Sequence, residues 1–239
     1  MAQVETTDVV VIGAGITGAS IASELAATCG VLLLEREDQP GYHTTGRSAA
    51  LFTETYGGEV NRALSHASRE FLEQPPPGFS PTPLLAPRGT LLVATESQVR
   101  KLRQTAEDCA GLLGNLAWLS EDDVRARVGC FAAGQVAAGL LEPDAMDIDV
   151  DALHRGYLRL FAARGGTLVN NADVRALEWA GGVWRASTSA GEFRAGRVVN
   201  AAGAWADEIG RLAGAKPIGL VPMRRTAITF DPPAGADIR

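Results

Sequence analysis

The turn at residues 13–18 constrains the fold of this chain more than any other feature. The apolar run TDVVVIG (7–13) is typical of a buried strand, and it leads into GAGITG (13–18), which has the pattern GxGxxG and opens a helical segment. A second apolar run, VLLLE (31–35), follows. Strand, helix and strand within about 30 residues predict a βαβ unit with a right-handed crossover.

Each glycine of this turn has a role in dinucleotide binding. Gly13 allows a tight turn, Gly15 lets the backbone approach a pyrophosphate, and Gly18 lets the helix and strand pack closely. The phosphates are expected on the N–H groups at the start of the helix, where Ile16 and Thr17 follow Gly15. The pattern therefore predicts a nucleotide cofactor bound at this end of the chain.

The end of the second strand defines the other side of the predicted site. Glu35 lies 20 residues after Gly15, where a carboxylate can accept hydrogen bonds from the adenosine ribose, and Arg36 follows it. A carboxylate at this position disfavours the 2′-phosphate of NADP. The motif does not distinguish NAD from FAD, because both carry ADP. The irregular, Thr- and Gly-rich segment PGYHTTGRSAA (40–50) favours FAD, since it offers many polar groups to a long cofactor.

Composition excludes several classes of function. The 239 residues carry a net charge of -6 without any cluster of Lys or Arg, which argues against a nucleic-acid surface. The longest apolar run is about five residues, so no membrane span is expected. MAQVETTD at the N-terminus lacks a basic signal-peptide region, and we expect a cytoplasmic protein. The three cysteines have no zinc-like spacing, and no metal site is predicted.

The rest of the chain alternates helices and strands. Helices are expected at 15–30, 59–73, 96–113, 149–165 and 204–214, with an additional short helix that begins after the capping box of Ser120 and Asp123. In the helix at 59–73, Val60, Leu64 and Phe71 share an apolar face. Strands are expected at 90–94, in a β meander over 167–195, at 197–203, and in the tail at 216–230. The segment QPPPGFSPTPLLAPRG (74–89) indicates a crossing between domains.

Longer blocks resemble a known family. YHTTGRSAA (42–50), QPPPGF (74–79), MDIDVDALHRGYLR (146–159), VVNAAGAW (198–205) and GLVPMRR (219–225) are similar, in this order, to segments of FAD-dependent D-amino acid oxidases and dehydrogenases. Among these, the bacterial enzymes that act on D-arginine are the most similar. The resemblance runs from about residue 7 to the end of the chain.

The resemblance implies an α/β fold in which a Rossmann-like FAD-binding domain is interleaved with an incomplete α+β substrate domain. We expect the FAD-binding domain at 1–86 and 142–215, and the partial substrate domain at 87–141 and 216–239. FAD would be bound non-covalently. Beyond the glycine motif, the residues implied in FAD binding are Thr44, Thr45, Gly46, Arg47, Ser48, Val174, Ala201, Ala202 and Gly203.

The resemblance also implies the chemistry. Arg225 matches the arginine that binds the substrate carboxylate, for which a planar guanidinium is suited, and Tyr56 matches an active-site tyrosine. The expected reaction oxidises the C–N bond of a D-amino acid by hydride transfer from Cα to flavin N5. The imine is then hydrolysed to a 2-oxo acid and ammonia. The expected partner is a small amino acid, and the electron acceptor is left open.

Three departures from the D-arginine enzymes leave alternatives open. Leu51 replaces an active-site histidine, and Thr90 replaces the glutamate that pairs with the substrate guanidinium, so a strict preference for arginine is not expected. Family members are also much longer, and this chain is expected to be truncated at its C-terminus. The alternatives are an FAD-binding fragment without independent activity, an FAD enzyme for another small amine or a 2-hydroxy acid, and an NAD-dependent dehydrogenase.

Overall fold

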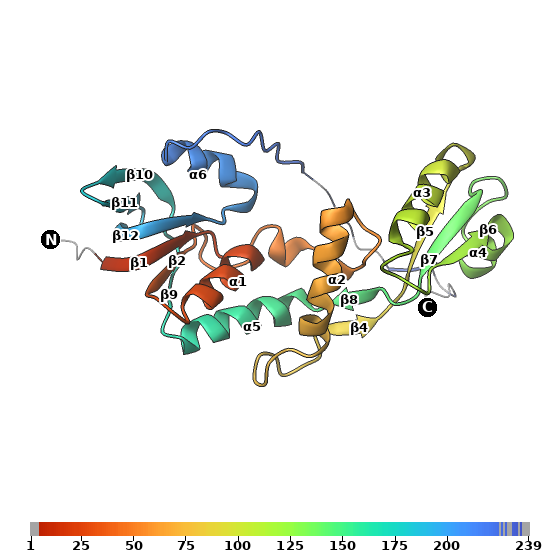
Figure 1. Cartoon of the computed structure of the whole chain (residues 1–239), viewed down its shortest axis with the longest axis horizontal. Helices are drawn as coiled ribbons and strands as arrows, with labels where there is room; N and C mark the ends of the chain where they lie inside the picture. The colour runs from red at the N-terminus through yellow and green to blue at the C-terminus, as the bar shows by residue number, and fades with distance from the viewer. Residues whose placement is uncertain (1–4, 225, 227, 229–230, 234, 236–239) are drawn as a thin grey trace.

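A six-stranded sheet forms one end of the molecule in this computed structural model, which describes residues 5–224, 226, 228, 231–233 and 235 (Figure 1). Its strand order is β10-β11-β12-β1-β2-β9. The strands are β1 (Glu5–Ile12), β2 (Val31–Leu34), β9 (Thr167–Val169), β10 (Val174–Ala180), β11 (Val183–Thr188) and β12 (Gly191–Asn200). The sheet is mixed, because β12, β1, β2 and β9 are parallel whereas β10 and β11 are antiparallel. This confirms the predicted Rossmann-like α/β fold.

The parallel strands are buried as their apolar runs predict. Every residue of β2 is buried, and Val9–Ile12 of β1 is at most 5% exposed. Strands covered on both faces need apolar side chains on both faces. The covering helices are α1 (Ile16–Leu25) and α5 (Val150–Ala163) on one face and α6 (Ala206–Leu212) on the other (Figure 1).

Two predictions for this sheet are wrong. The segment 167–169 is not part of a β meander but a parallel edge strand beside β2. The segments at 192–195 and 197–203 are not separate strands: β12 continues to Asn200, because the whole of its second half pairs in register with β1. A continuous parallel partner keeps the chain extended through Gly196.

Two smaller sheets follow toward the other end of the molecule. β3 (Leu51–Phe52), β8 (Met146–Ile148) and β4 (Leu85–Pro87) form one, and helix α2 (Glu59–Glu73) packs beside it around Phe52, Leu72 and Phe79. The other sheet has the order β5-β7-β6 and is covered by two helices (Figure 1). Its elements are β5 (Thr90–Ala94), β6 (Ala117–Ser120), β7 (Ala138–Glu142), α3 (Val99–Cys109) and α4 (Glu121–Arg127).

Other differences from the sequence predictions concern helix ends, faces and the tail. Helix α1 ends at Leu25 rather than near Gly30. Val60 and Leu64 on α2 are 71% and 63% exposed, so the predicted apolar face is not buried there. Residues 216–224 form no strand, and part of the remaining tail lies outside the described residues. The domain ranges given above stay predictions.

In the part of the chain described above, no helix is both long and apolar enough to cross a lipid bilayer.

Candidate functional site

The glycine-rich turn lies where the parallel strands end. Gly13 has φ +100°, a conformation that favours glycine, and a Cβ there would lie 2.5 Å from the carbonyl oxygen of Ala201. A Cβ on Gly18 would lie 1.7 Å from the carbonyl oxygen of Gly13. Both positions therefore exclude a side chain because backbone atoms occupy the space. Gly15 is different, since a Cβ there would face only the hydroxyl of Thr45, at 3.1 Å.

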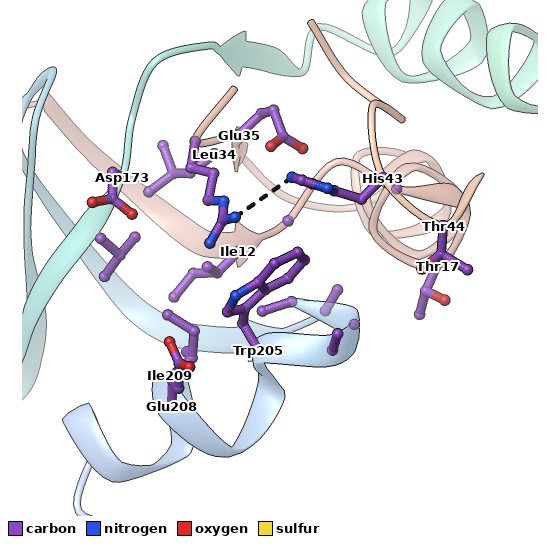
Figure 2. Close-up of a pocket in the computed structure, with 18 of the residues that line it drawn as sticks. Ile12, Thr17, Leu34, Glu35, His43, Thr44, Asp173, Trp205, Glu208 and Ile209 are labelled. Carbon is purple, nitrogen blue, oxygen red and sulfur yellow. Dashed lines mark hydrogen bonds between the residues drawn. The ribbon is translucent and has the colours of Figure 1, made fainter. Parts of the chain in front are cut away.

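A cavity of about 660 Å³ opens in front of this turn (Figure 2). It lies at the carboxyl ends of β1, β2 and β12, where open α/β sheets bind ligands. Segments distant in sequence meet here: the turn, the end of β2, residues 41–45, residues 172–174, residues 201–205 and helix α6. The predicted cofactor residues that line it are Gly13, Gly15, Ile16, Thr17, Glu35, Arg36, Thr44, Thr45, Val174, Ala201, Ala202 and Gly203.

Four predicted cofactor residues do not line this cavity. Gly18 is buried within α1 at its contact with the turn. Gly46, Arg47 and Ser48 instead line a second cavity of about 860 Å³, between residues 39–48 and the start of α5. The segment 40–50 therefore lies between two cavities, and Gly41, Tyr42 and Thr45 line both of them.

Glu35 is fixed by backbone groups. Its carboxylate accepts hydrogen bonds from the N–H groups of Ala14 (3.0 Å) and Glu37 (3.1 Å), and the residue is 7% exposed. Each carboxylate oxygen has two acceptor positions, so one position on each oxygen remains for another donor. The carboxylate can stabilise the turn and also accept a ribose hydroxyl.

Thr45 reaches the start of helix α1. Its hydroxyl accepts a hydrogen bond from the N–H of Ile16 at 2.9 Å, and Gly15 at the N-cap has no capping side chain of its own. The first N–H groups of a helix need acceptors from outside the helix. An anion bound at the start of α1 would therefore lie next to the hydroxyl of Thr45.

The sequence did not predict a cluster of aromatic and charged side chains at this cavity. The guanidinium carbon of Arg36 lies 3.8 Å from the ring centroid of Trp205, and the His43 ring lies 4.7 Å from the same ring. Trp205 and His43 lie side by side (Figure 2), and Arg36 Nη2 lies 3.5 Å from His43 Nε2. Hydrogen bonds from His43 and then Arg36 lower the pKa of Glu37, which more than offsets the effect of desolvation. The signal in the sequence was Trp205 itself, which directly follows the small residues of VVNAAGAW.

His154 on α5 was also missed. It is 5% exposed, and its Nε2–H donates to the carbonyl of Ala14 at 2.9 Å. A Cβ on Gly41 would lie 2.8 Å from its ring. His154 therefore joins α5 to both the glycine-rich turn and the segment that follows β2. Nothing local in the helix pattern distinguishes it from other buried helical residues.

Tyr56, one of the two predicted substrate residues, lies apart from these cavities. Tyr56 is 68% exposed and lines neither of them, and Arg225 lies outside the described residues. Directly before Tyr56, the segment 53–55 binds the buried carboxylate of Glu142 through the Glu54 N–H (2.8 Å) and the hydroxyls of Thr53 and Thr55 (2.6 Å each). The structure brings the cofactor residues together, whereas it does not bring Tyr56 to them.

Comparisons with known proteins show what the chain is similar to. L-2-hydroxyglutarate dehydrogenase of Escherichia coli (strain UMN026) is 26% identical over 222 residues, which cover 88% of this chain and 50% of that protein. Among solved structures, glycine oxidase from Geobacillus kaustophilus has a TM-score of 0.77 at 21% identity, covering 88% of this chain and 59% of that one. NikD, described as an unusual amino acid oxidase, has a TM-score of 0.71 at 26% identity, covering 87% and 54%.

This chain thus spans about half the length of the curated relatives it matches. The family model of the FAD-dependent oxidoreductases matches residues 8–239, which include the cavity and almost the whole chain. The chain therefore belongs to the family of FAD-dependent oxidoreductases.

Proposed function

We propose that this chain binds FAD non-covalently and belongs to an enzyme that oxidises the C–N bond of a small amino acid, with D-amino acids as the favoured class. The observation that supports this most directly is the cavity at the strand ends, where the glycine-rich turn, Glu35 and Val174 meet. Its volume of about 660 Å³ is within the usual range of cofactor and ligand sites. Gly15 keeps side-chain atoms out of the phosphate position.

In this proposal the residues present fit FAD. The N–H groups at the start of α1 and Thr45 would hold the pyrophosphate, and Glu35 would accept the ribose hydroxyls. Residues 44–48 would follow the cofactor toward its flavin end. When bound, FAD supplies the acceptor for a hydride, which carries the two electrons of the oxidation. The protein supplies binding and orientation of the substrate, for which the sequence offers Arg225 and Tyr56.

The region around Thr90 supports a neutral substrate side chain. Thr90 pairs with Glu142 across β5 and β7, so Glu142 is the acidic residue directly opposite it. Glu142 is 1% exposed and its carboxylate already accepts three hydrogen bonds from residues 53–55, so a substrate cation would have to displace these donors. A cationic substrate side chain would lack a partner, which costs about 1–3 kcal/mol in a closed site.

Steady-state kinetics test this preference. We expect kcat/KM for D-leucine to exceed that for D-arginine, and Thr90→Glu to raise kcat/KM for D-arginine about tenfold relative to the control Thr90→Gln. A strong preference of the unaltered chain for D-arginine would contradict the proposal of a neutral substrate.

A second candidate function is oxidation of a 2-hydroxy acid. The curated relatives reported above support it, since they are named L-2-hydroxyglutarate dehydrogenase. Anaerobic bleaching of the flavin absorbance separates the candidates when D-leucine, glycine, N-methylglycine and L-2-hydroxyglutarate are compared. If only L-2-hydroxyglutarate bleached the flavin, the result would contradict the amino acid proposal and favour oxidation of a 2-hydroxy acid. Release of hydrogen peroxide in air would identify oxygen as an electron acceptor.

The first experiment is the visible spectrum of the purified chain. A bound-flavin spectrum would support the proposed cofactor, and the substrate panel would follow. A folded chain that stays colourless after FAD is added would instead support the alternative of a fragment without independent activity. A parallel titration with NAD tests the remaining alternative. The cytoplasmic location stays a prediction, which fractionation of the native cells would test.

A further inference from the structure

Arg36 and Trp205 form a stacked pair inside the cofactor cavity. Arg36 follows Glu35 at the end of β2, and Trp205 ends the 3₁₀ turn η3 (Gly203–Trp205), which follows β12. The guanidinium carbon lies 3.8 Å from the indole ring centroid, and both residues line the cavity. Residues from two separate strand ends therefore meet face to face beside the glycine-rich turn.

Glu37 fixes the orientation of the guanidinium, and His43 in turn binds Glu37. Glu37 Oε1 accepts a hydrogen bond from Arg36 Nε at 3.0 Å, and His43 Nε2 lies 2.7 Å from the same oxygen. Arg36 Nη2 lies 3.5 Å from His43 Nε2. Among the described residues, Nη1 of Arg36 has no hydrogen-bond partner. Trp205 thus covers one face of the Arg36 guanidinium and Glu37 binds its Nε, while Nη1 keeps its N–H donors in a residue that lines the cavity.

We propose that Trp205 is a positioning residue for cofactor binding, which holds Arg36 flat so that its remaining N–H donors meet the adenosine and phosphate half of the dinucleotide. This inference rests on the proposed binding of FAD. An arginine side chain free in solvent loses rotamer freedom on binding a ligand. Stacking on an indole ring removes part of that cost beforehand, because cation–π contact with Trp is favourable and the guanidinium is planar.

The same kind of pair elsewhere in the chain provides a matched control. The guanidinium carbon of Arg103 lies 4.7 Å from the ring centroid of Trp118, and neither residue lines the cofactor cavity. Trp118 is 38% exposed, so its replacement leaves little unfilled volume. Trp205→Leu and Trp118→Leu therefore remove equivalent stacking contacts, one inside the cavity and one outside it.

Calorimetric titration with ADP, FAD and FMN tests the proposal. We expect Trp205→Leu to weaken ADP and FAD binding about fivefold, an effect of the size of one cation–π contact, and to leave FMN binding unchanged because FMN lacks the adenosine half. Trp205→Phe keeps an aromatic face and serves as a second variant in case Trp205→Leu misfolds. Its affinity for ADP and FAD should fall about twofold. Trp118→Leu should bind all three ligands as the unaltered chain does.

A double-mutant cycle tests whether Trp205 acts through Arg36. In the Arg36→Ala background, Trp205→Leu should cause no further loss of ADP affinity. Additive losses, or an unchanged ADP affinity in Trp205→Leu, would overturn this inference and leave the proposed cofactor intact. Failure of the unaltered, folded chain to bind ADP and FAD would overturn the proposed cofactor and this inference with it.

Discussion

Gly13 occupies a position that a side chain cannot share. Its φ is +100°, and a Cβ there would lie 2.5 Å from the Ala201 carbonyl oxygen, so Gly13→Ala combines backbone strain with a clash against backbone atoms. We expect a loss of about 3 kcal/mol in the free energy of unfolding, measured with urea, and loss of ADP binding. Gly111→Ala is the control, because open space surrounds Gly111, and it should stay within about 0.5 kcal/mol. Equal stability of the two variants would contradict this account of the turn.

Residues of the glycine-rich turn were predictable because their roles follow from chain order. A strand, a tight turn and a helix in succession fix where Gly13 and Gly15 lie, and the parallel neighbour strand brings Glu35 beside them. Trp205 and His154 were not predictable in this way. Their contacts with Arg36 and Ala14 join segments more than a hundred residues apart, and the sequence around Trp205 does not show that Arg36 is its partner.

Glu54 gives the chain a pH-dependent contribution to stability. Burial alone raises its pKa, but hydrogen bonds from Arg69 and His66 lower it below the ordinary value of 4.5. A lowered pKa in the folded state means that stability is present above pH 4.5 and is lost as the pH falls through the folded pKa. We therefore expect Glu54→Gln to lower the free energy of unfolding by about 3 kcal/mol at pH 7. The loss should become progressively smaller below about pH 4.5.

Urea unfolding at pH 7 and at pH 3.5 measures this difference. Glu59→Gln, an exposed acid at the start of α2, is the control and should stay within about 0.5 kcal/mol at both pH values. A gap between Glu54→Gln and the unaltered chain that grows toward acid pH would contradict the assignment of Glu54 as a stabilising carboxylate.

Helix α2 shows what periodicity predicts and what it does not. Its bounds, Glu59–Glu73, agree with the sequence prediction, because no glycine or proline interrupts the segment between Gly58 and the proline-rich stretch. The buried face differs from the prediction: Arg62 and Leu72 are buried, whereas Val60 and Leu64 are exposed. Periodicity locates an apolar face, but the packing partners around Phe52 and Phe79 decide which part of it is covered.

Substitutions on α2 test which of its apolar side chains are buried. Leu72 is 8% exposed and packs in the cluster with Phe52 and Phe79, so Leu72→Ala should lower the free energy of unfolding by about 2–4 kcal/mol. Leu64 is 63% exposed, so Leu64→Ala should change it by less than about 0.5 kcal/mol. The same substitution on one helix controls for helix propensity. Similar losses for both variants, measured by urea unfolding, would mean that Leu64 is covered in solution.

At the scale of the whole molecule, the six-stranded sheet and the β5-β7-β6 sheet lie at opposite ends (Figure 1). The chain enters and leaves the latter at one place, since the N–H of Gly89 donates to the carbonyl of Ala145 at 2.7 Å. This point lies close to the predicted domain boundaries at 87 and 141. The proline-rich segment 74–89 indicates where the chain enters this sheet. No comparable local pattern indicates where the chain leaves it.

Glu142 connects the β5-β7-β6 sheet to the segment that carries Tyr56. Its buried carboxylate accepts hydrogen bonds from the Glu54 N–H and from the hydroxyls of Thr53 and Thr55. Glu142→Leu would leave these donors without their acceptor, and we expect a loss of about 3 kcal/mol in the free energy of unfolding. Glu142→Gln should lower the free energy of unfolding by less, because its amide oxygen can still accept one of these hydrogen bonds.

Urea unfolding measures the loss of stability in Glu142→Leu, and amide hydrogen exchange measures the release of residues 53–56. Exchange at residues 53–56 should rise in Glu142→Leu even under conditions where the chain stays folded, because the anchor of that segment is gone. Glu107→Leu, at an exposed position on α3, is the control for introducing leucine and should change neither measurement. Unchanged exchange at 53–56 in Glu142→Leu would mean that other contacts hold Tyr56 in place, and that the two parts of the molecule are joined independently of this carboxylate.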